Sequence, residues 1–182
     1  MTSPVEGARA VEREDPPLHA TELEMLSAFL DHYRATILTK VEGLTQAQLA
    51  HAHPPSTLTL GGLLKHLAFV EESWFEEDLL GWPRREPFVD VDWDADPDWE
   101  FRTAADDTPE WLVARYEEAC ARSRAVVAQV GDLDAESVAF SRRRPDEHFT
   151  LRWILVHMIE ETARHAGHAD LIREAVDGVT GD

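Results

Sequence analysis

The sequence has little cysteine, few basic residues and no long apolar run. Cys120 is the only cysteine among the 182 residues, so no disulfide can form within the chain, as is usual in a reducing cytoplasm. No apolar stretch approaches the ~20 residues that a membrane-spanning helix needs. Residues 1–17 lack the apolar core of a secretory signal. We therefore expect a cytoplasmic protein that does not associate with a membrane.

Acidic residues far outnumber basic ones. The 36 Asp and Glu residues against 17 Lys and Arg residues give a formal net charge of −19. A field of this sign repels phosphate backbones, so we expect no nucleic-acid partner. Cys120 falls in an apolar stripe of helical spacing, which predicts a buried structural thiol and not a nucleophile.

Apolar residues recur at helical spacing in four long segments, each of which opens with threonine and ends near glycine, the usual caps of a helix. These segments are 21–43, 59–81, 108–131 and 150–178. A short helical turn is expected at 44–50, and only "FVDVDWD" (88–94) alternates like a strand. The predicted fold is all-α, a four-helix bundle with two long connections, 82–107 and 131–149.

The chain length suits one domain with a substantial core. We expect a disordered leader over residues 1–18 and a single bundle domain over residues 19–182. The acidic stretch "DVDWDADPDWE" (90–100) lacks the glycine and the closing glutamate of a calcium loop, so it is interpreted as a solvated acidic loop. The tryptophans of the first long connection either cap the bundle or line a dimer contact; they are Trp82, Trp93 and Trp99.

Four polar residues share one stripe of the last predicted helix. His157, Glu161, His165 and His168 follow at intervals of four, four and three and lie within roughly an 80° arc that also faces the apolar core. Burying such groups costs several kcal/mol each unless they are paired or bind a metal. A buried polar network remains an alternative, but a mixed histidine and carboxylate set on adjacent turns is typical of Zn²⁺, Ni²⁺ or Fe²⁺ sites.

Two ligands one turn apart on a single helix need a further ligand from another helix. His66, on an inward face of the second long segment beside the small residue Gly62, is the candidate. By spacing alone, the pairs 157/161 and 161/165 are equivalent as the chelating pair on the last helix. No His-Glu-x-x-His motif and no paired Glu-x-x-His motif is present, so neither a zincin nor a di-iron bundle is indicated.

Two stretches resemble a known family. "TLGGLLKHLAFVEESWF" (59–75) and "RWILVHMIEETARHAGHADLIREAVDG" (152–178) are similar to the DinB-like superfamily, in its DUF664 branch, over roughly residues 21–178. This branch is similar to mycothiol- and bacillithiol-dependent S-transferases and to the mycothiol-dependent maleylpyruvate isomerase. The resemblance implies a four-helix bundle of the DinB/YfiT-like type and a homodimer.

The resemblance also implies a ligand set. The superfamily has three histidines, of which the last two lie four residues apart, and the isomerase-like branch has glutamate as the first of that pair. Transferred to this chain, the metal ligands are His66, Glu161 and His165. His157 then becomes a second-shell group, and His168 a possible proton relay.

The implied function is a divalent-metal-dependent thiol S-transferase or isomerase. One Zn²⁺ or Ni²⁺ ion would hold a low-molecular-weight, mycothiol-like thiol as thiolate, which would attack a small-molecule electrophile. Arg143, within the basic run 142–144, is a candidate for substrate binding, although a solvated loop also accounts for it. The alternatives are a metal-assisted hydrolase with the same ligands and a non-catalytic metal-binding stress-response module.

Overall fold

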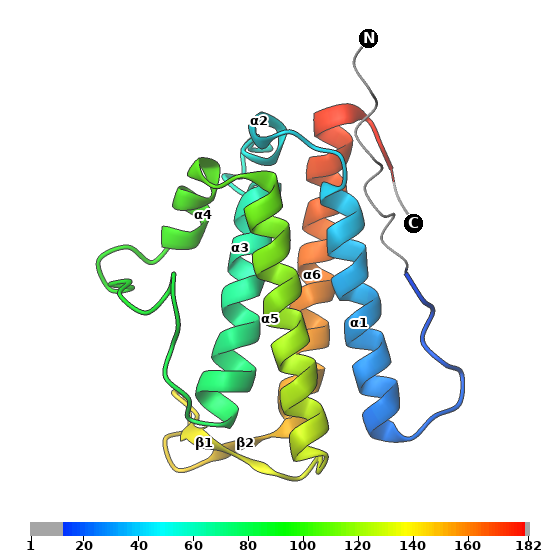
Figure 1. Cartoon of the computed structure of the whole chain (residues 1–182), viewed down its shortest axis with the longest axis vertical. Helices are drawn as coiled ribbons and strands as arrows, with labels where there is room; N and C mark the ends of the chain where they lie inside the picture. The colour runs from blue at the N-terminus through cyan, green and yellow to red at the C-terminus, as the bar shows by residue number, and fades with distance from the viewer. Residues whose placement is uncertain (1–12, 181–182) are drawn as a thin grey trace.

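The computed structural model describes residues 13–180, and four long helices side by side dominate it (Figure 1). They are α1 (Glu22–Val41), α3 (Leu60–Glu71), α5 (Pro109–Val130) and α6 (Leu151–Asp177). The helix α3 continues without a break into a π-helix, η1 (Glu72–Leu79). The helices α1 and α6 run in one direction, α3 and α5 in the other. This arrangement confirms the predicted all-α four-helix bundle.

The four predicted threonine caps form in the structure, a fifth forms at Thr45, and together they explain where the helices begin. Each of five threonine side chains accepts a hydrogen bond from a backbone N–H in the first turn of its helix. They are Thr21, Thr45, Thr59, Thr108 and Thr150. Gly131 and Gly178 follow α5 and α6 with φ of 65° and 76°, a conformation that glycine adopts without strain. The short helix α2 (Gln46–Leu49) matches the turn expected at 44–50.

The bundle core consists of two apolar clusters. One joins α1, α2, α3, α5 and the C-terminal half of α6, and the other joins α1, η1, α5 and the N-terminal half of α6. Cys120 lies in the first cluster and is 3 % exposed. Burial raises the pKa of its thiol well above the usual range. The predicted structural role of this cysteine is therefore confirmed.

Both long connections contain secondary structure. The first crosses from the end of η1 back to the start of α5 and contains α4 (Trp99–Thr103) and the 3₁₀ turn η2 (Ala104–Asp106). The second forms an antiparallel hairpin of β1 (Glu136–Phe140) and β2 (His148–Thr150), which closes one end of the bundle.

The strand expectation was wrong in both connections. Residues 88–94 form turns and coil, because Asp92 Oδ1 accepts the backbone N–H groups of Asp94 and Ala95 and closes a turn. The hairpin escaped prediction because its apolar residues point outward: Val138 and Phe140 are 61 % and 55 % exposed, while Ser137 is buried. Its polar and apolar faces are thus inverted relative to a strand that packs on a core.

The predicted leader is only partly described. Residues 1–12 lie outside the described residues, and residues 13–20 contain no helix or strand. This segment lies against α1, where Glu14 C=O is 2.9 Å from His32 Nδ1. Among residues 13–180, no helix is both long and apolar enough to cross a membrane.

Candidate metal centre

His66 lies in the middle of α3 and its ring is held on two sides. The ring stacks on Phe101 of α4, with centroids 5.1 Å apart and planes 27° apart. Gly62 makes this approach possible, because a Cβ at that position would lie 2.6 Å from Phe101 Cδ1. The His66 side chain is 20 % exposed. The helix α4 of the first long connection thus helps to fix the orientation of this histidine.

Glu161 and His165 face His66 from adjacent turns of α6. Glu161 Oε1 lies 3.3 Å from His66 Nε2 and 3.2 Å from His165 Nε2. Ligand atoms of all three residues lie within 4.8 Å of one another. The Glu161 and His165 side chains are only 14 % and 11 % exposed. The structure therefore brings together the three residues that the family resemblance implies as metal ligands.

The second nitrogen of each histidine is already engaged. His66 Nδ1 donates to Glu100 Oε1 at 2.9 Å, and His165 Nδ1 lies 3.3 Å from His168 Nδ1. Metal-ligating histidines usually donate their other N–H to such an acceptor, which fixes the tautomer and the ring orientation. Both Nε2 atoms are thereby left to face Glu161.

Hydrogen bonds and charges at the centre shift the pKa values of His66 and Glu161. Burial would lower the pKa of His66, but hydrogen bonds and negative charge from Glu100 and Glu161 outweigh burial and raise that pKa to about 8. Hydrogen bonds from His165 and His66 hold the pKa of Glu161 well below its usual range. Without a metal, a proton on His66 and the guanidinium of Arg164, 3.6 Å from Glu161, offset the two carboxylates. A divalent cation would take the place of that proton.

The donor set fits a divalent metal ion. Two imidazole nitrogens and one carboxylate oxygen are the ligands of open catalytic zinc sites, and they also suit nickel and ferrous iron. Glu100 Oε2 is buried and has no hydrogen-bond partner among residues 13–180. This oxygen belongs to the same carboxylate that binds His66, so a second acceptor without a partner is buried directly behind the centre.

His157 and His168, the two other histidines of the α6 stripe, differ in position. His168 contacts the ligand His165, and partial burial together with the charge of His165 lowers the pKa of His168. His157 lies one turn before Glu161, where its ring stacks on Trp153 at 5.1 Å and meets Trp74 edge-on at 4.7 Å. Its pKa is lowered by partial burial. His157 therefore belongs to an aromatic wall beside the centre.

Arg143 is not brought to the centre. It is exposed in the hairpin turn, whereas its neighbour Arg142 lines a pocket that also includes Phe69, one helical turn beyond His66. Trp93 packs on Phe69 at 4.4 Å, and Lys65 Nζ lies 4.5 Å from the ring of Trp99. These two tryptophans of the first long connection thus pack on side chains of α3.

Sequence reasoning missed Glu100. It was assigned to the solvated acidic loop, but it is 4 % exposed and holds His66. The loop interpretation applies to Asp90, Asp92 and Asp94, which are exposed. The available signal was local: Glu100 stands between Trp99 and Phe101, and an acid flanked by two aromatic residues is more easily buried than one within a run of aspartates.

Comparison with known proteins identifies the family. Residues 25–178 match the family model described as mycothiol-S-transferase. A crystal structure described as the conserved protein of locus from Enterococcus faecalis is similar at a TM-score of 0.61 and 16 % identity, covering 88 % of this chain and 100 % of that one, which supports the fold. The search of curated proteins gave no match. With five-sixths of its residues within the family match, this chain belongs to the mycothiol-S-transferase family.

Proposed function

We propose that the protein is a divalent-metal-dependent S-transferase that joins a low-molecular-weight thiol of the mycothiol type to a small electrophile. The observation that carries this proposal is the convergence of His66 Nε2, His165 Nε2 and a Glu161 carboxylate oxygen. Family membership supplies the thiol class. Zinc and nickel suit the donor set best.

Three protein ligands leave coordination positions for a substrate. A divalent ion held by His66, Glu161 and His165 would act as a Lewis acid that lowers the pKa of a thiol, so that the sulfur reacts as thiolate. Glu161 reduces the net charge of such a centre to +1, and one thiolate would neutralise it. The chain itself keeps both Nε2 atoms directed at one point through the contacts at Nδ1 of each histidine.

Other residues near the centre would accept the proton of the thiol and contact the electrophile. In the transfer, the S–H bond of the thiol and the bond between carbon and the leaving group of the electrophile break, and a new S–C bond forms. One proton and the leaving group are released. Partial burial lowers the pKa of His168, and this histidine, in contact with His165, is the candidate to relay the proton to solvent. The aromatic wall of Trp74, Trp153 and His157 offers an apolar surface to an electrophile.

A metal-assisted hydrolase is the second candidate, because the same three ligands would equally activate water. A non-catalytic metal-binding stress-response module is the third. We place the enzyme in the cytoplasm, consistent with its single buried thiol, and expect a homodimer, as the family resemblance implies.

The direct test loads the purified protein with Zn²⁺ or Ni²⁺ and measures metal content and turnover. Mycothiol, bacillithiol, glutathione and water would each be offered with one electrophile, such as monochlorobimane. We expect about one ion per chain and turnover that is fastest with mycothiol and that disappears in Glu161→Gln. Equal product formation with and without any thiol would identify a hydrolase, and a metal-loaded protein without turnover would favour the binding module.

A further inference from the structure

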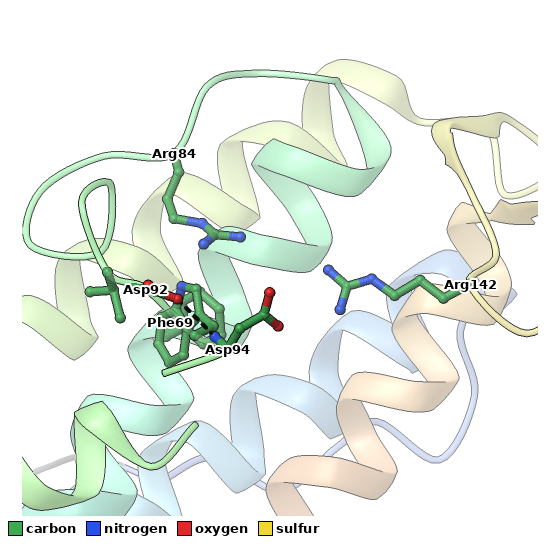
Figure 2. Close-up of a pocket in the computed structure, with 7 residues that line it drawn as sticks. Phe69, Arg84, Asp92, Asp94 and Arg142 are labelled. Atoms are coloured by element: carbon green, nitrogen blue, oxygen red, sulfur yellow. Dashed lines mark hydrogen bonds between the residues drawn. The ribbon is translucent and has the colours of Figure 1, made fainter. Parts of the chain in front are cut away.

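A pocket of about 460 Å³ opens one helical turn away from the metal centre. It lies between α3, the first long connection and the turn of the hairpin (Figure 2). In Figure 2, Arg84 and Arg142 reach toward Asp94 from different segments of the chain. Phe69 in its wall stands three residues after His66 on the same helix, about 4.5 Å further along the axis.

One wall of this pocket is aromatic. Phe69 and Trp93 stack with ring centroids 4.4 Å apart and planes 23° apart, and the guanidinium of Arg84 lies 5.2 Å from the centre of the Phe69 ring. The indole Nε1 of Trp93 is buried and has no hydrogen-bond partner in the part of the chain that the structure describes. Because this atom is covered, the wall offers a ligand an apolar surface and not a hydrogen bond.

The charged groups of the pocket argue against an anionic ligand. Arg84 is already held by both carboxylate oxygens of Glu77, at 2.8 and 2.9 Å. Arg142 and the Asp94 carboxylate form no hydrogen bond or ion pair with residues 13–180. With Asp92 also in the lining, two carboxylates balance two arginines, so the pocket has no net positive charge to attract an anion. A suitable ligand is therefore neutral and offers both donors and acceptors.

A hydroxyl-rich ring meets these requirements. Its hydroxyl groups donate to Asp94 and accept from Arg142, while its C–H face covers the aromatic wall. We propose that this pocket binds the neutral polyhydroxylated part of the thiol co-substrate, an inference that rests on the proposed function. In mycothiol, the cysteine is attached to a glucosamine–inositol unit of this chemical class.

Binding at this pocket would position the sulfur. The sugar unit would lie against Phe69 and Trp93, and the cysteine attached to it would extend along α3 toward His66 Nε2. The pocket then acts as a specificity determinant, because a thiol without the sugar unit gains nothing from Arg142 or Asp94. Selectivity between thiols would come from this pocket, and reactivity from the metal centre.

Two variants test the pocket: Arg142→Gln and Asp94→Asn, each of which removes a charge at nearly constant side-chain size. Arg144→Gln is the matched control, because Arg144 belongs to the same turn and pairs with Glu147 at 2.8 Å. The thiols are mycothiol and N-acetylcysteine, with monochlorobimane as electrophile. The readout is the ratio of their kcat/KM values, which cancels any general loss of activity or of folded protein.

We expect Arg142→Gln and Asp94→Asn each to lower the mycothiol to N-acetylcysteine ratio at least tenfold, mainly through the KM for mycothiol, and Arg144→Gln to keep the ratio within twofold. An unchanged ratio in both pocket variants, in an enzyme that turns over mycothiol, would overturn the pocket proposal alone.

A binding measurement separates this proposal from the proposed function. Calorimetric titration with the thiol-free probe N-acetylglucosaminyl-inositol should show binding to the wild type that weakens at least tenfold in Arg142→Gln. If the wild type binds the probe in this way but transfers no thiol, the proposed function fails and the pocket assignment stands. If the wild type does not bind the probe, the pocket assignment is overturned.

Discussion

Two polar clusters lie on the continuous helix formed by α3 and η1. In one, buried carboxylates are paired with arginines, and in the other they meet histidines. In the first cluster, Glu71, Glu72 and Glu76 are each at most 1 % exposed. Arginines from three other segments meet them: Arg34 of α1, Arg85 of the first long connection, and Arg115 and Arg122 of α5. In the second cluster, His66 meets Glu161, His165 and Glu100, and no lysine or arginine takes the central position.

The difference separates a structural cluster from a functional one. Buried carboxylates that each meet a guanidinium need no further partner, so the first cluster is complete without a ligand. In the second cluster, three ligand atoms converge on one point, and the one arginine near them, Arg164, reaches only the outer oxygen of Glu161, at 3.6 Å, within the described residues 13–180. A shared point of convergence, and not the burial of charge alone, is what indicates a binding site.

The largest expected effect is on stability, in the first cluster. Glu71→Ala should lower the free energy of unfolding by about 3 kcal/mol, because buried Arg34 loses both contacts with Glu71, at 2.5 and 2.7 Å, and keeps only the more exposed Asp31, at 2.8 Å. The measurement is urea denaturation of the metal-free protein. The double variant Arg34→Met/Glu71→Leu should recover most of the loss, since it removes both charges. A single variant as stable as the wild type would mean that this pair contributes nothing to the fold.

The second expected effect is on metal binding and leaves stability nearly unchanged. His66→Ala should lower metal affinity by more than ~100-fold, because the chelating pair on α6 loses its ligand from α3. The free energy of unfolding of the metal-free variant should lie within about 1 kcal/mol of the wild-type value, since the His66 side chain is partly exposed. Metal content and competition with a chromophoric chelator measure the first quantity, and urea denaturation the second. Full retention of metal would exclude His66 as a ligand.

A third, smaller effect concerns Glu100. Glu100→Ala should weaken metal binding by about 10- to 100-fold, because His66 Nδ1 loses its acceptor and the ring its fixed orientation. Glu100→Gln keeps an acceptor oxygen but removes the charge. Its metal affinity should therefore lie between those of Glu100→Ala and the wild type. Chelator competition at constant pH measures both variants. Identical affinities for the three proteins would show that Glu100 neither orients His66 nor attracts the ion.

The sequence predicted the bundle and the polar stripe of the last helix for a common reason, the 3.6-residue period, whereas the choice of His66, Glu161 and His165 as ligands came from the family resemblance. Threonine caps and apolar spacing placed the four helices, and the same spacing put Glu161 and His165 on one inward face. The arginine–glutamate cluster could not be predicted in this way, because Arg34 and Glu71 are 37 residues apart and a single periodic segment does not reveal its partner. The pocket was missed because Trp93 and Arg84 lie in a connection without any period.

The smallest expected effect decides between the two equally spaced pairs on α6. His157→Ala should change metal affinity by less than about threefold, because the His157 ring packs between Trp74 and Trp153 and its nearest ion pair is with Glu160, at 3.6 Å. His165→Ala, by contrast, should lose the metal as His66→Ala does. Both histidines lie four residues from Glu161, so the two variants make the same chemical change one turn to either side of it. If His157→Ala lost the metal and His165→Ala kept it, the chelating pair would be 157/161, and the contact between His168 and His165 would no longer bear on the metal.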